Sequence, residues 1–292
     1  MTAIGFVGLG AMGLPMAQNL VRAGFAVAGF DLKTAALEAL AETGGRRAQS
    51  AADAARGADA LILMVVNAAQ ANTVLLDGGA LEALAPDALV ILMATCAPDA
   101  ATAIADTVAA SGRRFVDAPV SGGVAGAIGG TLTIMAAAPA DVMAAVRPIL
   151  DVLGRDKVFC VGETPGQGAM VKTVNQLLAG VHIAAAAEAF SLAAKAGIDP
   201  AILLEILSGS AASSWMLKDR GPRMLEDDPR VASAVDIFVK DLGIVLDAGR
   251  ATRAALPLAA AAHQMFLAAS GLGHGPEDDS QVLAAYRALN QR

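Results

Sequence analysis

The chain has 292 residues, of which 55% are hydrophobic and 17% charged; this composition excludes a disordered protein and predicts about two domains with large cores. The net charge of −7 at pH 7 comes without a basic face, which argues against nucleic acid as a partner. The two cysteines, Cys96 and Cys160, have neither the number of a disulfide framework nor a metal-ligand spacing, so we expect no metal site.

No membrane-spanning segment is predicted. The longest uncharged stretch, residues 118–140, contains five glycines and two prolines, which interrupt the run of about 20 apolar residues that a spanning helix needs. The sequence enters a strand-like run directly after Met1, without the basic region of a signal peptide. We therefore expect a cytoplasmic protein that has no membrane partner.

The first part of the chain alternates short apolar runs with amphipathic segments. Strands are predicted at residues 3–7, 26–30, 60–66, 89–93, 114–116, 131–136 and 157–161. Helices are predicted between them at residues 12–23, 34–42, 51–56, 69–76, 99–110 and 140–153. Glycines at 24, 44, 57 and 112 fall where helices should end. This alternation predicts an α/β domain with a doubly wound parallel sheet over residues 1–163.

The pattern changes after Thr164. A helical period runs from residue 167 to 196, long enough to join two domains. Further helices are predicted at residues 200–207, 214–225, 234–251, 258–269 and 280–290. No strand is predicted here, so residues 164–292 are expected to form an all-helical domain.

The segment Gly8-Leu9-Gly10-Ala11-Met12-Gly13 follows the first predicted strand and opens the first predicted helix. In this setting Gly8 makes the tight turn, Gly10 admits a pyrophosphate, and Gly13 allows close packing of helix on strand. The helix N-terminus adds free N–H groups and a positive dipole. The pattern predicts a Rossmann dinucleotide-binding domain; the alternative is an ordinary glycine-rich turn.

Asp31 stands just after the second predicted strand. A carboxylate there binds the ribose 2′-hydroxyl and repels a 2′-phosphate, which favours NAD over NADP. Alternatively, Asp31 caps the helix that begins near Lys33. Lys33, as a neighbouring cation, would also soften the discrimination against NADP.

Polar and small residues follow the next two strands. Val65-Val66-Asn67 ends the third long strand, and Thr95 follows the fourth. Ligands of doubly wound sheets bind at the carboxyl ends of strands, so these residues are expected to line the cofactor crevice. Turn formation or helix capping is the alternative for Asn67 and Thr95.

Three further segments carry functional groups whose ordinary interpretation is structural. Ser121-Gly122-Gly123 can form a concavity of N–H groups that suits a carboxylate, or it is a flexible loop. Lys172, an isolated charge on the long helix, shares a face with Asn175, and by itself would be a lysine that reaches to solvent. Lys240-Asp241 would ordinarily be a solvated pair on a helix.

Four blocks in order resemble the β-hydroxyacid dehydrogenase family, which includes 3-hydroxyisobutyrate dehydrogenase and tartronate semialdehyde reductase. The blocks are residues 5–13, 117–123, 166–175 and 240–242. The resemblance covers nearly the whole chain. It implies an N-terminal Rossmann domain, a helical C-terminal domain (residues 164–292) for substrate binding and dimerisation, and an active site between them.

The resemblance also implies the substrate-binding and catalytic roles. Lys172 would be the catalytic lysine, Ser121-Gly122-Gly123 would hold the carboxylate of a small anionic hydroxy acid, and Asn175 would position that substrate. Trp215 and Asp241 would lie at the substrate pocket; core packing is the equal alternative for Trp215.

The implied reaction is reversible hydride transfer between a hydroxy-acid carbon and the nicotinamide of NAD. Thr95 and Lys240 would contact the cofactor near the nicotinamide. Lys172 would accept the hydroxyl proton during oxidation and return it during reduction. An ordinary lysine pKa is about 10.4, and burial or a neighbouring cation lowers it toward neutrality. The family is commonly dimeric or tetrameric, so a homo-oligomer is expected.

Within the family, the chain resembles the L-threonate dehydrogenase subgroup most closely, over residues 65–70, 176–184, 214–216, 233–242 and 277–280. This implies oxidation of L-threonate at its 2-hydroxyl to 2-oxo-tetronate. Some enzymes of that subgroup are expected to carry histidine where this chain has Asn175, so a tartronate semialdehyde reductase or a 3-hydroxyisobutyrate dehydrogenase remains an alternative. A non-catalytic dinucleotide sensor is the alternative of another class; relatives without activity would be expected to lose the lysine, which is present here.

Overall fold

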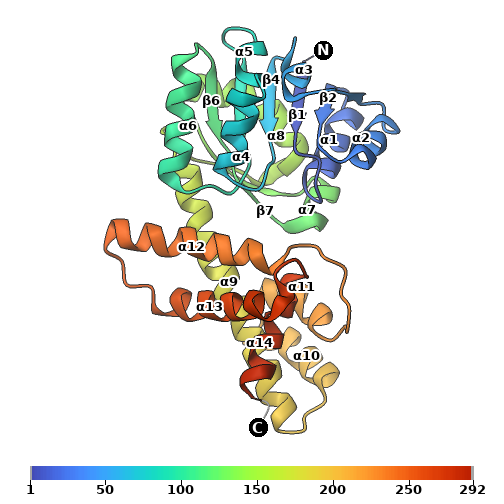
Figure 1. Cartoon of the computed structure of the whole chain (residues 1–292), viewed down its shortest axis with the longest axis vertical. Helices are drawn as coiled ribbons and strands as arrows, with labels where there is room; N and C mark the ends of the chain where they lie inside the picture. Colours follow the sequence, from blue (N-terminus) through green and yellow to red (C-terminus); the bar gives the residue numbers. More distant parts are fainter. Residues whose placement is uncertain (1, 291–292) are drawn as a thin grey trace. The chain divides into compact units, whose positions relative to one another are not determined.

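The computed structural model describes residues 2–290 and divides by contacts into two compact units, Met1–Lys172 and Thr173–Arg292 (Figure 1). The division falls inside helix α9 (Gln167–Lys195). The sequence places the domain boundary at residue 163, and that boundary stays a prediction.

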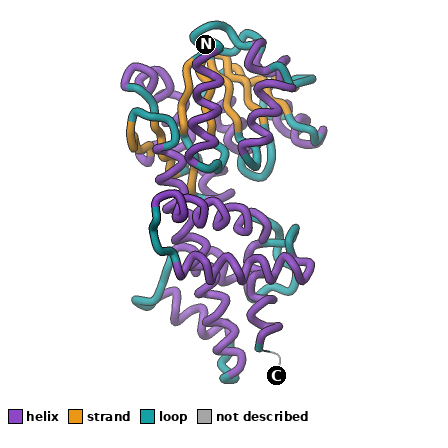
Figure 2. The backbone as a smooth tube through the Cα atoms, turned by 60° about the vertical axis from the view of Figure 1, so that its left-hand side comes forward, coloured by secondary structure: helices purple, strands orange, loops and turns teal. Residues whose placement is uncertain are grey.

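The first unit is built on one nine-stranded sheet, whose strands lie together in Figure 2. The strands are β1 (Ala3–Val7), β2 (Ala26–Phe30), β3 (Arg46–Arg47), β4 (Ala60–Leu63), β5 (Leu89–Leu92), β6 (Arg114–Asp117), β7 (Val120–Ser121), β8 (Thr133–Ala137) and β9 (Val158–Gly162). Their order is β3-β2-β1-β4-β5-β6-β8-β7, with β9 paired to β8. All pairs from β3 to β6 are parallel, which confirms the predicted doubly wound sheet.

Two strands depart from the predicted parallel arrangement. β8 runs antiparallel to both β6 and β7, and β9 pairs in parallel with β8, so it shares the reversed direction. The connection from β7 to β8 contains only the short helix α7 (Gly123–Gly129), and a chain that turns back over so few residues joins antiparallel strands. β3 and β7 were not predicted, since two residues carry no alternation.

Helices cover both faces of this sheet because its strands alternate their side chains between two cores. Ile62 and Ile91 belong to one cluster of buried side chains, and Leu61, Leu63 and Val90 belong to the other. Besides α7, the helices are α1 (Gly13–Arg22), α2 (Thr34–Ala41), α3 (Ala51–Ala55), α4 (Ala68–Asn72), α5 (Ala80–Ala83), α6 (Pro98–Ala110) and α8 (Ala140–Gly154). Strands buried on both faces explain the continuous apolar runs in the sequence.

The predicted helix stops are confirmed. Gly24, Gly44, Gly57 and Gly112 follow α1, α2, α3 and α6, and all four have positive φ. Glycine adopts this left-handed conformation without the steric penalty of a side chain.

The second unit is helical, as predicted. Its helices after α9 are α10 (Pro200–Gly209), α11 (Trp215–Met224), α12 (Val235–Thr252), α13 (Pro257–Ala269) and α14 (Val282–Leu289). Stacked rings of Phe238 and Phe266, with centroids 5.1 Å apart, join α12 to α13 in its core. Among residues 2–290, one isolated β-bridge lies outside the named strands, and it joins Ala234 to Asp278 in this helical unit.

Helix α9 is long and apolar enough to cross a membrane by length and composition, a possibility that the sequence interpretation did not raise. Half of its apolar window is buried inside the structure. The core helix of a soluble protein passes the same test of length and composition, so α9 by itself does not indicate a membrane span.

Candidate active site

The glycine motif has the geometry of a phosphate cradle. Gly8 has φ +96°, and a Cβ on it would stand 2.4 Å from the Met64 carbonyl oxygen. A Cβ on Gly13 would stand 1.8 Å from the Gly8 oxygen, whereas one on Gly10 would have no heavy atom within 4 Å. No side chain among residues 2–290 caps the N-terminus of α1. The tight turn at Gly8 and the close packing at Gly13 are therefore confirmed. The open space at Gly10 suits the approach of a dinucleotide pyrophosphate, whose binding there stays a prediction.

Asp31 is bonded to the glycine motif itself. Its Oδ2 accepts the Leu9 N–H at 2.7 Å and its Oδ1 accepts the Lys33 N–H at 2.9 Å. Helix α2 begins at Thr34 and has no side-chain cap, so the interpretation of Asp31 as a helix cap is wrong. A carboxylate oxygen accepts more than one hydrogen bond, and Asp31 therefore keeps the capacity to bind a ribose hydroxyl.

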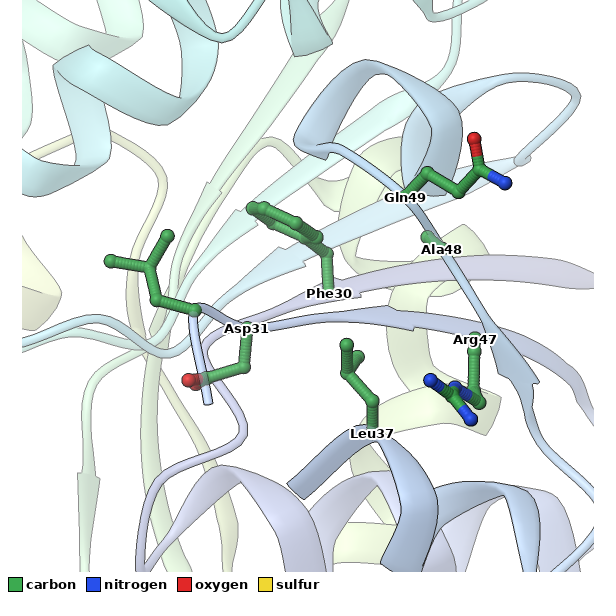
Figure 3. A pocket seen from close by; sticks show the side chains of 7 residues that line it. Phe30, Asp31, Leu37, Arg47, Ala48 and Gln49 are labelled. Carbon is green, nitrogen blue, oxygen red and sulfur yellow. The ribbon is translucent and has the colours of Figure 1, made fainter. Parts of the chain in front are cut away.

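A pocket of about 510 Å³ adjoins Asp31 (Figure 3). It is lined by Phe30, Asp31, Leu32, Leu37, Arg47, Ala48 and Gln49. Arg47 is the cation of this pocket, and the sequence interpretation missed it because the two-residue strand β3 was not predicted. The adjacent pair Arg46-Arg47 was the available signal. β3 pairs with β2 in parallel and so carries Arg47 to the strand end that bears Asp31.

The residues after β4 and β5 lie at this same carboxyl edge of the sheet. Asn67 caps α4, since its Oδ1 accepts the Gln70 N–H at 2.9 Å. The Gln70 side chain in turn accepts the Val66 N–H at 2.9 Å. The capping alternative for Asn67 is thus confirmed, while cofactor contacts of Val65, Val66, Asn67 and Thr95 stay predictions.

The Ser121-Gly122-Gly123 segment is part of regular structure. Ser121 ends β7, and Gly123 begins α7. Gly122 and Gly123 have φ of +127° and +60°, a backbone region that favours glycine. The flexible-loop alternative is therefore wrong, and carboxylate binding by this segment stays a prediction.

Asp117 anchors the start of α9. Its carboxylate is buried at the end of β6, and its Oδ2 accepts the N–H groups of Gly166 and Ala169, each at 2.9 Å. A Cβ on Gly168 would stand 2.8 Å from the Asp117 carbonyl oxygen, so glycine is required where the helix meets the strand. The sequence showed Asp117 only as part of a block, because its partners are about 50 residues away.

Burial raises the pKa of Asp117 to about 6, despite the backbone N–H groups that lower it. The folded state therefore retains a proton that the unfolded chain releases near pH 4. From this group alone, the free energy of unfolding should fall by about 2 kcal/mol as the pH rises from 4 to 7. Asp117→Asn keeps an acceptor oxygen without a titrating proton. Urea unfolding at several pH values should show wild type losing stability relative to this variant across that range; parallel curves would contradict the assignment.

Lys172 is buried, with 6% of its surface exposed, and lies one turn into α9 beyond the residues that Asp117 holds. A buried ammonium is not a lysine that reaches to solvent, so that interpretation is wrong. The structure places Lys172 on α9, at the end of the first unit. Its catalytic role stays a prediction.

Asn175, Asp241 and Lys240, three predicted site residues of the second unit, belong to one chain of polar contacts. Gln176, which was not predicted, connects Asn175 to Asp241 in it. Asn175 Nδ2 donates to Gln176 Oε1 at 2.9 Å, and Gln176 Nε2 donates to Asp241 Oδ2 at 2.5 Å. Lys240 Nζ lies 2.9 Å from Asp241 Oδ1. Asp241 is 2% exposed, so a solvated Lys–Asp pair is the wrong interpretation. Gln176 was overlooked beside Asn175 because a glutamine inside an apolar helix gives no periodic signal.

Trp215 does not belong to this hydrogen-bonded chain. It is the first residue of α11, where Ser214 caps the helix, and 54% of its surface is exposed. The interpretation of Trp215 as a core residue is therefore wrong, and its place at a substrate pocket stays a prediction.

Comparison with known proteins agrees with this geometry. Residues 3–162 match the NAD binding domain of 6-phosphogluconate dehydrogenase, and residues 166–286 match a domain described as NAD-binding of NADP-dependent 3-hydroxyisobutyrate dehydrogenase. An L-threonate dehydrogenase from Cupriavidus necator is 46% identical over 98% of this chain and 96% of its own length. The L-threonate dehydrogenase of Escherichia coli strain K12 is 42% identical, over 98% of this chain and 95% of that protein.

A solved structure extends the likeness to three dimensions. The crystal structure of a 3-hydroxyisobutyrate dehydrogenase from Salmonella typhimurium superposes with a TM-score of 0.94 at 42% identity, covering 97% of this chain and 99% of that one. The two matched domains and the full-length relatives lead to one conclusion. The chain belongs to the 3-hydroxyisobutyrate dehydrogenase-like family of NAD(P)-dependent hydroxyacid dehydrogenases, enzymes that act on CH–OH groups.

Proposed function

We propose that this dehydrogenase oxidises L-threonate at its 2-hydroxyl to 2-oxo-tetronate, with NAD as the preferred cofactor. The full-length likeness to L-threonate dehydrogenases, at 41–46% identity, carries the choice of substrate. The likeness to a protein named 3-hydroxyisobutyrate dehydrogenase at 42% identity makes that hydroxy acid the second candidate.

The chemistry divides between cofactor and protein. NAD bound in the Gly8–Gly13 cradle would supply the hydride acceptor. Lys172 Nζ takes the proton of the substrate hydroxyl, which leaves the electron pair of that O–H bond to form the carbonyl. The Ser121–Gly123 segment holds the carboxylate, and Asn175, oriented by Gln176, holds a substrate oxygen.

A substrate panel tests this function. Initial rates would be measured with L-threonate, 3-hydroxyisobutyrate and glycerate, the reduced form of tartronate semialdehyde, each with NAD and NADP. We expect kcat/KM for L-threonate to exceed the others at least tenfold, about 1.4 kcal/mol in transition-state binding. A higher value for another acid would transfer the assignment to that acid. Absence of reduced cofactor with every acid would favour the dinucleotide sensor.

Asp31 is expected to set the preference for NAD. Asp31→Ala removes the partner of the ribose 2′-hydroxyl and the charge that repels a 2′-phosphate. The ratio of kcat/KM for NAD to that for NADP should fall about tenfold or more, as the loss of one charged contact implies. Asp59→Ala is a matched control. The Asp59 carboxylate, like that of Asp31, accepts a backbone N–H, that of Ala3 at 2.8 Å, but Asp59 precedes β4 and so lies at the opposite ends of the strands. An unchanged ratio in Asp31→Ala would remove Asp31 from cofactor selection.

A further inference from the structure

One amide side chain joins the dinucleotide-binding helix to the helix that follows the Ser121–Gly123 segment. Asn19, on α1, donates from Nδ2 to the carbonyl oxygens of Ala127 at 2.8 Å and Ile128 at 3.2 Å, in the last turn of α7. Arg22 donates to Asn19 Oδ1 at 3.1 Å, which orients the amide with its N–H groups toward α7. Within residues 2–290, the hydrogen bonds between α1 and α7 are the two that Asn19 Nδ2 donates.

Helix α7 depends on such external donors. Its sequence is GVAGAIG, with glycine at three of seven positions, and glycine is a poor helix former. A helix this short has few internal hydrogen bonds and leaves its last carbonyls without partners. Asn19 donates to two of the last carbonyls, although that of Ala127 also accepts the Gly130 N–H at 3.4 Å, and Arg155 donates to a third, that of Gly129, at 3.1 Å.

Each of the two helices that Asn19 connects begins at a predicted anion-binding segment. Helix α1 begins at the phosphate cradle, and α7 begins directly after Ser121-Gly122. Helices α1 and α7 contact each other. A shift of α7 would therefore move the Ser121–Gly123 segment relative to the cradle.

We propose that Asn19 is a positioning residue that fixes the Ser121–Gly123 segment relative to the bound dinucleotide, and so sets the affinity for the hydroxy-acid carboxylate. This inference rests on the proposed function, in which that segment binds the carboxylate. Asn19 touches neither substrate nor cofactor; it acts through the backbone of α7.

The neighbouring residue provides a matched control. Gln18 is also an amide on α1, and its Nε2 donates to a backbone carbonyl, that of Ala39 at 3.0 Å, but this carbonyl belongs to α2. Asn19→Asp and Gln18→Glu each replace an amide by a carboxylate of the same shape and remove the donor. Asn19→Ala removes the donor of Asn19 without introducing a charge.

Steady-state kinetics provides the first readout. In Asn19→Asp and Asn19→Ala, KM for the hydroxy acid should rise about tenfold, as the loss of two hydrogen bonds implies. KM for NAD should stay within about twofold of wild type, and Gln18→Glu should change neither value beyond that range. Equal increases in both KM values, or an unchanged KM for the hydroxy acid, would overturn the proposal. The same increase in Gln18→Glu would also overturn it.

Amide hydrogen exchange provides a second readout that does not depend on activity. Exchange in residues 121–130 should be about tenfold faster in Asn19→Ala than in wild type, and exchange in residues 13–22 should be unchanged. If wild type oxidises no hydroxy acid but this local change occurs, the proposed function fails and the positioning role stands. If wild type is active and residues 121–130 exchange as before, the positioning role fails by itself.

Discussion

Replacing Lys172 with alanine is expected to reduce kcat by about 10²–10⁴-fold, the contribution of a positioned general acid–base group. The variant would leave the hydroxyl proton without an acceptor as the carbonyl forms. Binding of NAD, measured by fluorescence or calorimetry, should survive, because the glycine cradle and Asp31 are formed by β1, β2 and α1. Turnover close to that of wild type would remove Lys172 from the mechanism.

Two companion variants separate proton transfer from charge. Lys172→Arg keeps a cation but cannot release its proton near neutral pH, so kcat should stay as low as in the alanine variant. Lys218→Ala removes an exposed lysine of α11 and should leave kcat unchanged. Recovery of turnover in Lys172→Arg would show that Lys172 acts as a charge and not as a base.

Replacing Arg220 with alanine is expected to destabilise the second unit by about 3–5 kcal/mol, since the buried Asp279 carboxylate loses its two-nitrogen partner and keeps the more distant Arg223 Nη2 at 3.9 Å. Arg220 binds Asp279 through two nitrogens, Nε to Oδ1 at 3.1 Å and Nη2 to Oδ2 at 2.8 Å. Asp279 is 0% exposed. Urea unfolding followed by circular dichroism would measure the loss, and Arg147→Ala is the control, because its pair with Asp151 is solvent-exposed and contributes at most about 1 kcal/mol.

A double variant tests the cause of that loss. Arg220→Met with Asp279→Leu removes both charges and fills the space with apolar groups, which is often neutral for stability. The double variant should therefore be more stable than Arg220→Ala. If it is equally unstable, the loss in Arg220→Ala reflects missing packing and not an unpaired carboxylate.

The sequence predicted local structure well wherever a pattern extended over several residues. β1 and β2 begin and end at the predicted residues, and α2 and α6 begin within one residue of prediction. β3, β7 and α5 were missed because two to four residues show neither period. α7 was missed because its three glycines disfavour a helix, and donors elsewhere in the chain stabilise it.

The candidate site also contains residues whose roles depend on their neighbours in sequence and residues whose roles depend on distant partners. The turn at Gly8, the close packing at Gly13 and the position of Asp31 after β2 follow from conformations that only a few adjacent residues control. The roles of Asp117, Gln176 and Asn19 come from partners 49 to 109 residues away. Sequence periodicity does not encode which distant carbonyl or N–H group a polar side chain will meet.

By itself, then, the sequence determined the dinucleotide cradle and the order of strands and helices, because backbone conformation and the alternation of apolar side chains are local properties. Tertiary structure alone decided the reversal of β8, the burial of Lys172 and the pairing of Arg220 with Asp279. Each of these depends on which segments pack together, and burial turns an ordinary surface charge into one whose partner or proton determines both stability and chemistry.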